Sequence, residues 1–280
     1  MSPLTYLKRL FGPVEQPGEP EAHAPEGVSV YAIGDIHGRA DLLDVLLGAV
    51  EQDREGEPAS AIVFMGDYVD RGRQSREVTD LLLAYRDAVS PSANASHAAE
   101  VRFLRGNHDQ SLLDFLEAPS TGPTWSDFGG RETLASYGVH IPETRADEAA
   151  WALTSEAFAE ALPPDHLAFF QSLEYACEYG GYFFAHAGVR PGVPLGLQSQ
   201  QDLMWIRQPF LEDTRRLEKV VVHGHTPTPE VYADRRRIGV DTGAYATGVL
   251  TALKLKGAGR SLLQAHRIRQ SPPGVRTLPL

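Results

Sequence analysis

Six short apolar runs recur along the chain from Val28 onward, and five of them stop at a glycine that stands beside aspartate, histidine or asparagine. The runs are SVYAIGDIHG, AIVFMGDYVDRG, VRFLRGNHD, YFFAHAG, VVVHGHT and RIGVDTGAYATGVLTALKL. Runs of this length with this β-branched content are typical of buried strands. Helical patterns lie between the first runs, so the alternation predicts an α/β fold.

Three segments between these runs have the spacing of amphipathic helices. They are ADLLDVLLGAVEQDRE, SREVTDLLLAYRDAV and DQSLLDFLEA, and Ser75 at the start of the second is the expected N-cap. The later runs follow one another at shorter spacings without clear helices between them. We therefore expect part of the sheet to be antiparallel.

Changes in composition divide the chain into segments. Residues 1–27 are expected to be a flexible N-terminal tail, since 12–27 are rich in Pro, Glu, Ala and Gly. Residues 28–256 form the predicted domain, and 257–280 a basic C-terminal tail. Within the domain, residues 112–176 break the rhythm and contain two expected helices, DEAAWALTSEAFAEAL and DHLAFFQSL. This helical insertion could complete the core, cap the active site, or do both.

Composition excludes several classes of protein. The chain has 37 acidic and 26 basic residues, a net charge of -11, which argues against a nucleic-acid partner. No run approaches the roughly 18 apolar residues of a membrane span. The one cysteine, Cys177, excludes an intrachain disulfide and a Cys-rich zinc site, and the expected location is the cytoplasm. The basic residues after Asp241 indicate a solvated tail or an anchor for an acidic partner.

The ends of the predicted strands carry the residues that point to chemistry. In an open α/β sheet the carboxyl ends of the strands converge on one edge. Carboxylates mixed with imidazoles suit Mn²⁺, Fe or Zn²⁺ better than Ca²⁺ or Mg²⁺ alone, and cations relieve the repulsion among the carboxylates. Each short motif alone is a common turn, and only their occurrence at five successive strand ends indicates a site. The residues are Asp35, His37, Asp67, Asp70, Asn107, His108, Asp109, His186, His223 and His225.

These motifs resemble a known family. GDIHG at 34–38, GDYVDRG at 66–72 and LRGNHD at 104–109 resemble the three signature blocks of the phosphoprotein phosphatase (PPP) family of calcineurin-like metallophosphoesterases. HAG and HGHT, which begin at His186 and His223, resemble its two later histidine blocks. The resemblance runs from Val28 to Lys256 and is greatest to the bacterial serine/threonine-phosphatase-like branch. It implies a calcineurin-like metallophosphatase sandwich of mixed β-sheets flanked by helices. The third block of the family usually ends in Glu. This chain has Asp109 there, at a position that supports the site and is not itself an implied metal ligand.

The resemblance also implies two divalent metal ions, with Mn²⁺ favoured and Fe or Zn²⁺ possible, and a metal-bridging hydroxide that attacks phosphorus directly. His225 is preferred over His223 as the last ligand because the family ligand follows the glycine, and a contribution from His223 stays open. The implied ligands are Asp35 and His37 for the first metal, Asp67 for both metals, and Asn107, His186 and His225 for the second.

Further residues are implied to act on the substrate. His108 resembles the general acid that protonates the leaving alkoxide, and Asp70 the carboxylate that orients it. Arg71 resembles the guanidinium that grips the phosphate. Arg207 is either a second phosphate clamp or a surface salt-bridge residue, and Tyr245 is a possible rim residue.

The implied function is hydrolysis of phosphomonoesters, with phosphoserine and phosphothreonine as the substrate class. The alternative is a dinucleoside polyphosphate hydrolase of the diadenosine tetraphosphate type, whose second block resembles GDLVARG and lacks the residue equivalent to Asp70. A non-enzymatic scaffold is disfavoured because every matched ligand is present. A nuclease is disfavoured because Pro227 stands where diesterases carry a further histidine. The expected partner is a phosphorylated protein or a small phosphoester, with no nucleic acid and no membrane span.

Overall fold

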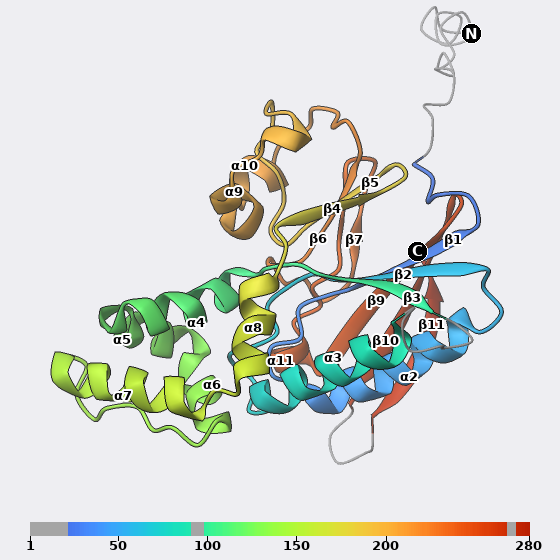
Figure 1. The fold of residues 1–280 in the computed structure, drawn as a ribbon. Helices are drawn as coiled ribbons and strands as arrows, with labels where there is room; N and C mark the ends of the chain where they lie inside the picture. The colour runs from blue at the N-terminus through green and yellow to red at the C-terminus, as the bar shows by residue number, and fades with distance from the viewer. Residues whose placement is uncertain (1–21, 91–97, 268–272) are drawn as a thin grey trace, which may run out of the picture.

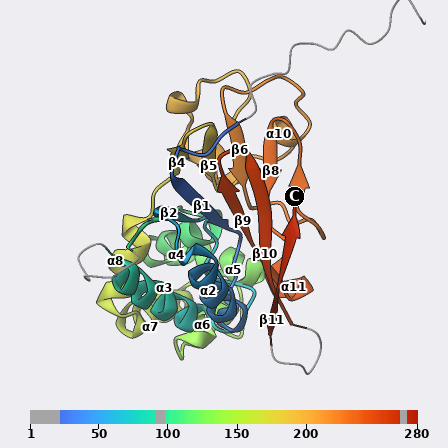
Figure 2. The ribbon, with the colours of Figure 1, turned by 90° about the vertical axis from the view of Figure 1, so that its right-hand side faces the viewer.

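The computed structural model describes residues 22–90, 98–267 and 273–280. In this part of the chain, two mixed β-sheets pack face to face and helices cover their outer faces (Figures 1 and 2). This is the α/β class and the layered architecture that the sequence predicts.

The larger sheet has six strands in the order β11-β10-β9-β1-β2-β3. β1, β2 and β3 run parallel, whereas β9, β10 and β11 pair antiparallel, so the expected antiparallel part of the sheet is present. Its strands are β1 (Val28–Ile33), β2 (Ala59–Phe64), β3 (Ala99–Phe103), β9 (Val249–Lys256), β10 (Gly259–His266) and β11 (Gly274–Pro279).

The smaller sheet has five strands in the order β4-β5-β6-β8-β7, in which β5, β6 and β8 run parallel. Its strands are β4 (Ala176–Tyr179), β5 (Tyr182–Ala185), β6 (Val220–His223), β7 (Tyr232–Ala233) and β8 (Arg237–Gly239).

Alternation along the strands separates the core into layers. On β1, Val30 and Ala32 face the smaller sheet and join an inter-sheet cluster with Phe184. Tyr31 and Ile33 face the opposite way, into the cluster beneath the helices. The outer face of the smaller sheet is covered by α9 (Gln200–Trp205) and α10 (Gln208–Leu211), which add a third apolar cluster.

The first two predicted helices are confirmed as α2 (Ala40–Arg54) and α3 (Ser75–Val89). The N-cap prediction is wrong, because Gln74 occupies that position and Ser75 is the first helical residue. The Ser75 hydroxyl instead accepts a hydrogen bond from the backbone N–H of Asp70 at 3.2 Å. The residue therefore supports a loop of the site rather than its own helix.

The predicted helical insertion is seen as a group of helices at the lower left of Figure 1. Two of its helices, α7 and α8, agree with the expected segments to within two residues. The helices from the third predicted one onward are α4 (Asn107–Glu117), α5 (Gly122–Trp125), α6 (Arg131–Ser136), α7 (Glu148–Ala161), α8 (Pro164–Ser172), α9 (Gln200–Trp205), α10 (Gln208–Leu211) and α11 (Ala244–Thr247). Among the described residues, none of the helices is both long and apolar enough to cross a membrane.

The structure differs from the predicted boundaries at both ends of the domain. Residues 257–280, expected to be a basic tail, include β10 and β11, and Leu263 of β10 is buried in the core. At the other end, residues 1–21 lie outside the described residues, but Ala24 is buried and its N–H donates to the carbonyl of Gly257 at 2.9 Å. Basic charge in residues 257–280 and a high proline content in residues 12–27 favour exposure to solvent. Neither feature prevents a segment from forming a strand or from packing against the domain.

Candidate metal centre and active site

Both sheets deliver predicted site residues at the carboxyl ends of parallel strands. Since these ends meet at one edge of the two-sheet sandwich, the six predicted metal ligands come together, and each is at most 6% exposed. Asp35 follows β1, Asp67 follows β2, Asn107 begins α4 just after β3, His186 follows β5 and His225 follows β6.

The loops that carry these residues have an unusual backbone. The non-glycine residues with positive φ in the described part of the chain are His37, Asp67, Asp70, Arg71 and His225, with φ of 46°, 53°, 72°, 66° and 63°. Every one of them is a predicted site residue. Left-handed backbone at a non-glycine residue costs of order 1–3 kcal/mol and persists where the surroundings enforce it. The fold therefore holds these side chains at some cost in stability.

Asp67 lies at the centre of the site. Its Oδ2 is 3.4 Å from Nε2 of His37 and 3.5 Å from Nε2 of His186. Its Oδ1 accepts the backbone N–H of His108 at 3.0 Å. Two groups of side chains whose ligand atoms lie within 4.8 Å of one another share Asp67: one contains His37 and His108, the other His186 and His225. This position between two groups is the one expected of a bridging carboxylate.

Backbone carbonyls orient two of the imidazoles. Nδ1 of His37 is 2.8 Å from the carbonyl of Val69, and Nδ1 of His186 is 2.8 Å from that of Met65. With the proton on Nδ1 of each ring, Nε2 is the unprotonated nitrogen and lies within 3.5 Å of Asp67, the usual arrangement of histidine ligands. Burial lowers the pKa of His37 to about 3 and that of His225 to about 2, which keeps both rings in the neutral form that binds metals.

The donor set fits divalent cations. Oδ1 of Asp35 and Nε2 of His225 are buried and have no hydrogen-bond partner among the described residues. Burial and the nearby Asp241 and Asp67 raise the pKa of Asp35 well above its usual range. Buried carboxylates that repel one another and unpartnered donor atoms are what a cation would compensate.

Asp241 is a buried residue of this site that the sequence analysis did not single out. It is 2% exposed, follows β8, and its Oδ1 accepts the N–H of Gly243 at 2.8 Å. Burial, together with the charge of Asp67, raises its pKa to about 6. The sixth apolar run begins with RIGVD, so Asp241 follows the first strand of that run. The reasoning applied to the other five runs, that polar residues at strand ends form the site, would have found it.

His108 and Asp70 form a buried pair beside Asp67. Nδ1 of His108 lies 2.6 Å from Oδ2 of Asp70, which is fully buried. Burial disfavours the charged imidazole, but the carboxylates of Asp67 and Asp70 outweigh it and raise the pKa of His108. A histidine with a raised pKa that is fixed at one nitrogen can deliver a proton from the other.

Asp70 is itself held by the helical insertion. Nε1 of Trp125 donates to Oδ2 at 2.8 Å, and the hydroxyl of Thr133 donates to Oδ1 at 2.6 Å. The sequence analysis did not assign either residue to the site, and no pattern in the insertion indicated them. The insertion therefore holds Asp70 at the candidate site, in addition to completing the core.

Arg71 points into the site. Its Nη1 is 3.0 Å from Nε2 of His37, and its Nη2 is 2.8 Å from Nε2 of His108. The guanidinium carbon lies 4.8 Å above the ring of Tyr245, which places that residue at the rim of the site. Arg71 therefore presents a fork of donors to the group that contains His37, Asp67 and His108.

Arg207 and His223 differ in their surroundings. Arg207 is exposed. Burial of His186 and His225 is the main cause that lowers the pKa of each, and the positive charge of Arg207 lowers both further. His223 is instead packed on Phe210, with ring centroids 5.2 Å apart, and its Nε2 is 3.1 Å from Nη1 of Arg237. The structure does not include His223 in either potential metal-binding group.

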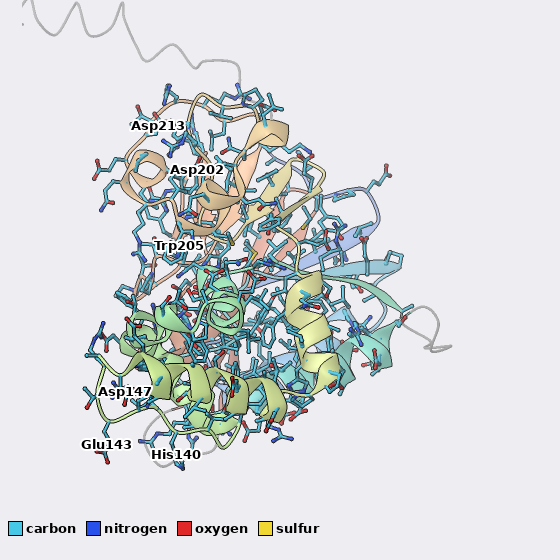
Figure 3. The ribbon with its side chains drawn as sticks, turned by 60° about the vertical axis from the view of Figure 1, so that its left-hand side comes forward. His140, Glu143, Asp147, Asp202, Trp205 and Asp213 are labelled. Atoms are coloured by element: carbon cyan, nitrogen blue, oxygen red, sulfur yellow. The ribbon has the colours of Figure 1, made fainter. Side chains whose placement is uncertain are left out.

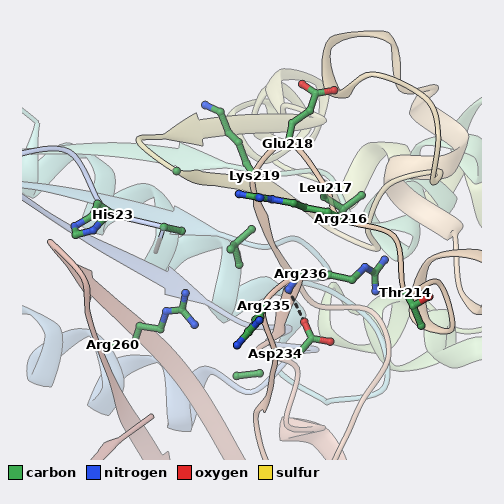
Figure 4. A pocket seen from close by; sticks show the side chains of 14 residues that line it. His23, Thr214, Arg216, Leu217, Glu218, Lys219, Asp234, Arg235, Arg236 and Arg260 are labelled. Carbon is green, nitrogen blue, oxygen red and sulfur yellow. Dashed lines mark hydrogen bonds between the residues drawn. The ribbon is translucent and has the colours of Figure 1, made fainter. Parts of the chain in front are cut away.

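Two cavities differ in their relation to the site. One of about 730 Å³ adjoins it and is lined in part by Arg71, Phe128 and Tyr245. A larger one, of about 970 Å³, lies at the opposite ends of the strands, where Val220 begins β6, and several arginines line it (Figure 4). The larger cavity contains none of the predicted ligands.

Comparisons with known proteins agree with this geometry. A family model described as calcineurin-like phosphoesterase matches residues 28–258. The bis(5'-nucleosyl)-tetraphosphatase PrpE (asymmetrical) of Anoxybacillus flavithermus is 27% identical over 244 residues, which cover 79% of this chain and 88% of the relative. A structure solved as that of a candidate diadenosine tetraphosphatase matches with a TM-score of 0.55 and 19% identity over 90% of this chain and 93% of that chain. The cold-active protein-tyrosine phosphatase of a psychrophilic Shewanella matches with a TM-score of 0.53 and 16% identity over 91% of this chain and 83% of that chain.

Proposed function

The chain belongs to the calcineurin-like phosphoesterase family of metal-dependent hydrolases, and on that premise we propose that it cleaves phosphomonoesters, with phosphoserine and phosphothreonine as the first substrate class to test. The observation that carries this proposal is the buried pair of His108 and Asp70 beside Asp67, at 2.6 Å. An alkoxide is a poor leaving group and needs a proton, which this pair is placed to supply.

Two divalent cations would supply a nucleophile at neutral pH and compensate the negative charge of the phosphate. Manganese is our first choice, with iron or zinc as alternatives. We propose that the ions are held by the six predicted ligands, with Asp67 between them. The proposed set is Asp35, His37 and Asp67 for one ion and Asp67, Asn107, His186 and His225 for the other, and all of these side chains are buried.

The remaining side chains act on the substrate. Arg71 grips two phosphate oxygens, since a guanidinium offers two parallel N–H donors where lysine offers a point charge. This requires the guanidinium to turn from His108 toward the phosphate, which leaves Nε2 of His108 free to face the leaving oxygen. Arg207, whose positive charge contributes to lowering the pKa of His186, is proposed as a further phosphate clamp.

A second candidate is hydrolysis of dinucleoside polyphosphates, which is favoured by the 27% identity to a bis(5'-nucleosyl)-tetraphosphatase. Its leaving group is a phosphate of low pKa that needs little proton donation. Retention of Asp70, which orients His108, is therefore a reason to keep the monoester first.

A comparison of rates tests the two candidates directly. Purified protein with Mn²⁺ is given a phosphoserine peptide, a phosphotyrosine peptide and diadenosine tetraphosphate, with Asp67→Asn as the control for a contaminating phosphatase. We expect the highest kcat/KM with the phosphoserine peptide. A tenfold or greater preference for diadenosine tetraphosphate would reverse the order of the candidates.

A further inference from the structure

Two residues of the helical insertion engage both carboxylate oxygens of Asp70. Nε1 of Trp125, the last residue of α5, donates to Oδ2, and the hydroxyl of Thr133, on α6, donates to Oδ1. The same Oδ2 lies 2.6 Å from Nδ1 of His108. Asp70, Trp125 and Thr133 are each at most 3% exposed, so these bonds compensate a charge that water does not reach.

The ring of Trp125 is fixed by the core of the insertion. It lies against Gly130, where an added Cβ would overlap the indole. Its ring centroid is 5.1 Å from that of Phe115 on α4 and 6.0 Å from that of Phe158 on α7. Close-packed aromatic rings of this kind leave little room for rotation. The packing of the insertion therefore sets the direction in which the indole N–H points.

The hydroxyl of Thr133 holds the backbone of Asp70 as well as its carboxylate. Besides donating to Oδ1, it accepts the backbone N–H of Asp70 at 2.9 Å. Ser75 assists, since its hydroxyl lies 3.0 Å from that of Thr133 and accepts the same N–H at 3.2 Å. Asp70 has φ of 72°, a left-handed conformation that persists where the surroundings enforce it. Thr133 is therefore part of what enforces it.

These contacts also determine which nitrogen of His108 can give up a proton. An ionised carboxylate only accepts hydrogen bonds, and Oδ2 of Asp70 already receives one from Trp125. Nδ1 of His108 is then the donor in its bond to Oδ2. A proton that His108 delivers to a leaving group must therefore come from Nε2, and the orientation of the ring decides where that proton points.

We propose that Trp125 and Thr133 are positioning residues for proton transfer to the leaving group and that they act through Asp70 and His108. The inference rests on the proposed hydrolysis of phosphomonoesters. A misaligned acid slows the reaction most where the leaving group needs a proton. Loss of either donor should therefore affect alkyl esters more than aryl esters. It should also affect kcat more than KM, because the acid acts on substrate that is already bound.

Trp125→Phe and Thr133→Val test this, because they remove the N–H and the hydroxyl and retain most of the side-chain volume. On a phosphoserine peptide with Mn²⁺, we expect kcat to fall by about fivefold in each variant and by roughly 20-fold or more in the double variant, the usual contribution of one and two hydrogen bonds. The loss on p-nitrophenyl phosphate should be less than about twofold, since this leaving group departs without a proton. KM and metal content should not change, and Thr133→Ser, which keeps the hydroxyl, should retain the rate.

The insertion also provides matched controls on α7. Figure 3 shows this helix, which begins after the labelled Asp147, near the lower edge of the molecule. Nε1 of Trp151 donates to the carbonyl of Arg145 at 3.2 Å, and the hydroxyl of Thr154 donates to that of Ala150 at 2.9 Å. Both side chains are buried. Trp151→Phe and Thr154→Val remove the same two groups, and they should lower the thermal midpoint without changing the ratio of the rates on the two esters.

Three kinetic outcomes would overturn the proposal. The first is an equal loss on both esters in the double variant, and the second is a loss no greater than in the controls. The third is a rate for Thr133→Ser as low as that for Thr133→Val, which would assign the effect to packing instead of the hydroxyl.

A measurement without substrate separates this proposal from the proposed function. If the wild type does not hydrolyse the phosphoserine peptide, the proposed function fails, and NMR spectra of the zinc-loaded protein test the positioning alone. The short bond from Nδ1 of His108 to Asp70 should give a downfield proton resonance, which His108→Asn identifies by removing it. We expect this resonance to shift or disappear in the double variant of Trp125 and Thr133 and to persist in both controls. Its absence from the wild type, or an unchanged resonance in the double variant, would refute the positioning role.

Discussion

Replacement of His108 by asparagine should separate proton donation from metal binding. The side chain that changes contacts Asp70 and Arg71, and none of the six proposed ligands is removed. We therefore expect both metal ions to stay bound. The rate on an alkyl phosphate such as phosphoserine should fall by roughly 10²–10⁴, the usual contribution of a positioned acid.

The size of the loss should depend on the leaving group. p-Nitrophenolate leaves without a proton, so the same variant should lose less than about tenfold on p-nitrophenyl phosphate. Asp70→Asn should show the same pattern more mildly. A hydrogen bond to a charged group is worth about 1.5–3 kcal/mol, or roughly 10–150-fold in rate. The amide fits this position, because the Thr133 hydroxyl now donating to Oδ1 can accept from the new NH₂ instead.

The assay compares kcat/KM for the two esters, with metal content and thermal midpoint measured on each variant. His166→Asn is the matched control, because His166 is also buried and its Nε2 is 3.0 Å from a carboxylate, that of Asp80, outside the site. This control should lower stability and leave the ratio of the two rates as it is. Equal losses on both esters in His108→Asn, with two metals retained, would remove His108 from the acid role.

Four further predictions follow from the contacts described above. Asp67→Asn should abolish hydrolysis and weaken binding of both metals, and two tightly bound ions per chain measured by metal analysis would contradict its bridging role. Arg71→Ala should raise KM and weaken inhibition by inorganic phosphate while metal content is retained, and unchanged phosphate inhibition would show that another residue grips the substrate. Glu57 forms ion pairs with Lys254 and Lys256, which lower its pKa to about 2. These ion pairs therefore stabilise the fold fully above the unfolded pKa of about 4.3, and their contribution is lost as the pH falls toward 2. Glu57→Gln should therefore lower the free energy of unfolding at pH 7 by about 1–2 kcal/mol after screening of the exposed lysine, and a difference from the wild type that persists at pH 2 in urea titrations would contradict this. Deleting residues 1–26 removes the three hydrogen bonds that residues 22–24 make with the rest of the domain. Since each bond is worth about 1 kcal/mol, the thermal midpoint should fall by several degrees. An unchanged midpoint would show that these contacts contribute nothing to stability.

The sequence was most informative where local pattern and final position coincide. α2 and α3 could be predicted because their apolar spacing matches the face that they bury. The six proposed ligands could be located because each follows a strand, and parallel strands place their carboxyl ends together. β10 was not predicted, because the basic residues of 257–280 are typical of a solvated tail although buried apolar residues alternate with polar ones between them. The burial of Leu263 shows that residues 257–280 continue the larger sheet beyond β9.

The residues around Asp70 show what such patterns leave out. Trp125 and Thr133 lie 55 and 63 positions after Asp70, in a segment without a strand end, and only the packing of the insertion brings them to the carboxylate. No periodicity encodes a contact of that kind. The backbone conformation also depends on contacts distant in the sequence. Asp70 and Arg71 have φ of 72° and 66°, values that a short motif does not impose by itself. The N–H of Arg71 bonds to Gly129, and that of Asp70 to Thr133, both from the insertion. The insertion therefore holds the loop that carries Asp70 and Arg71, the residues proposed to orient the acid and to bind the phosphate. We expect variation in this segment to change substrate preference without altering any of the six proposed ligands.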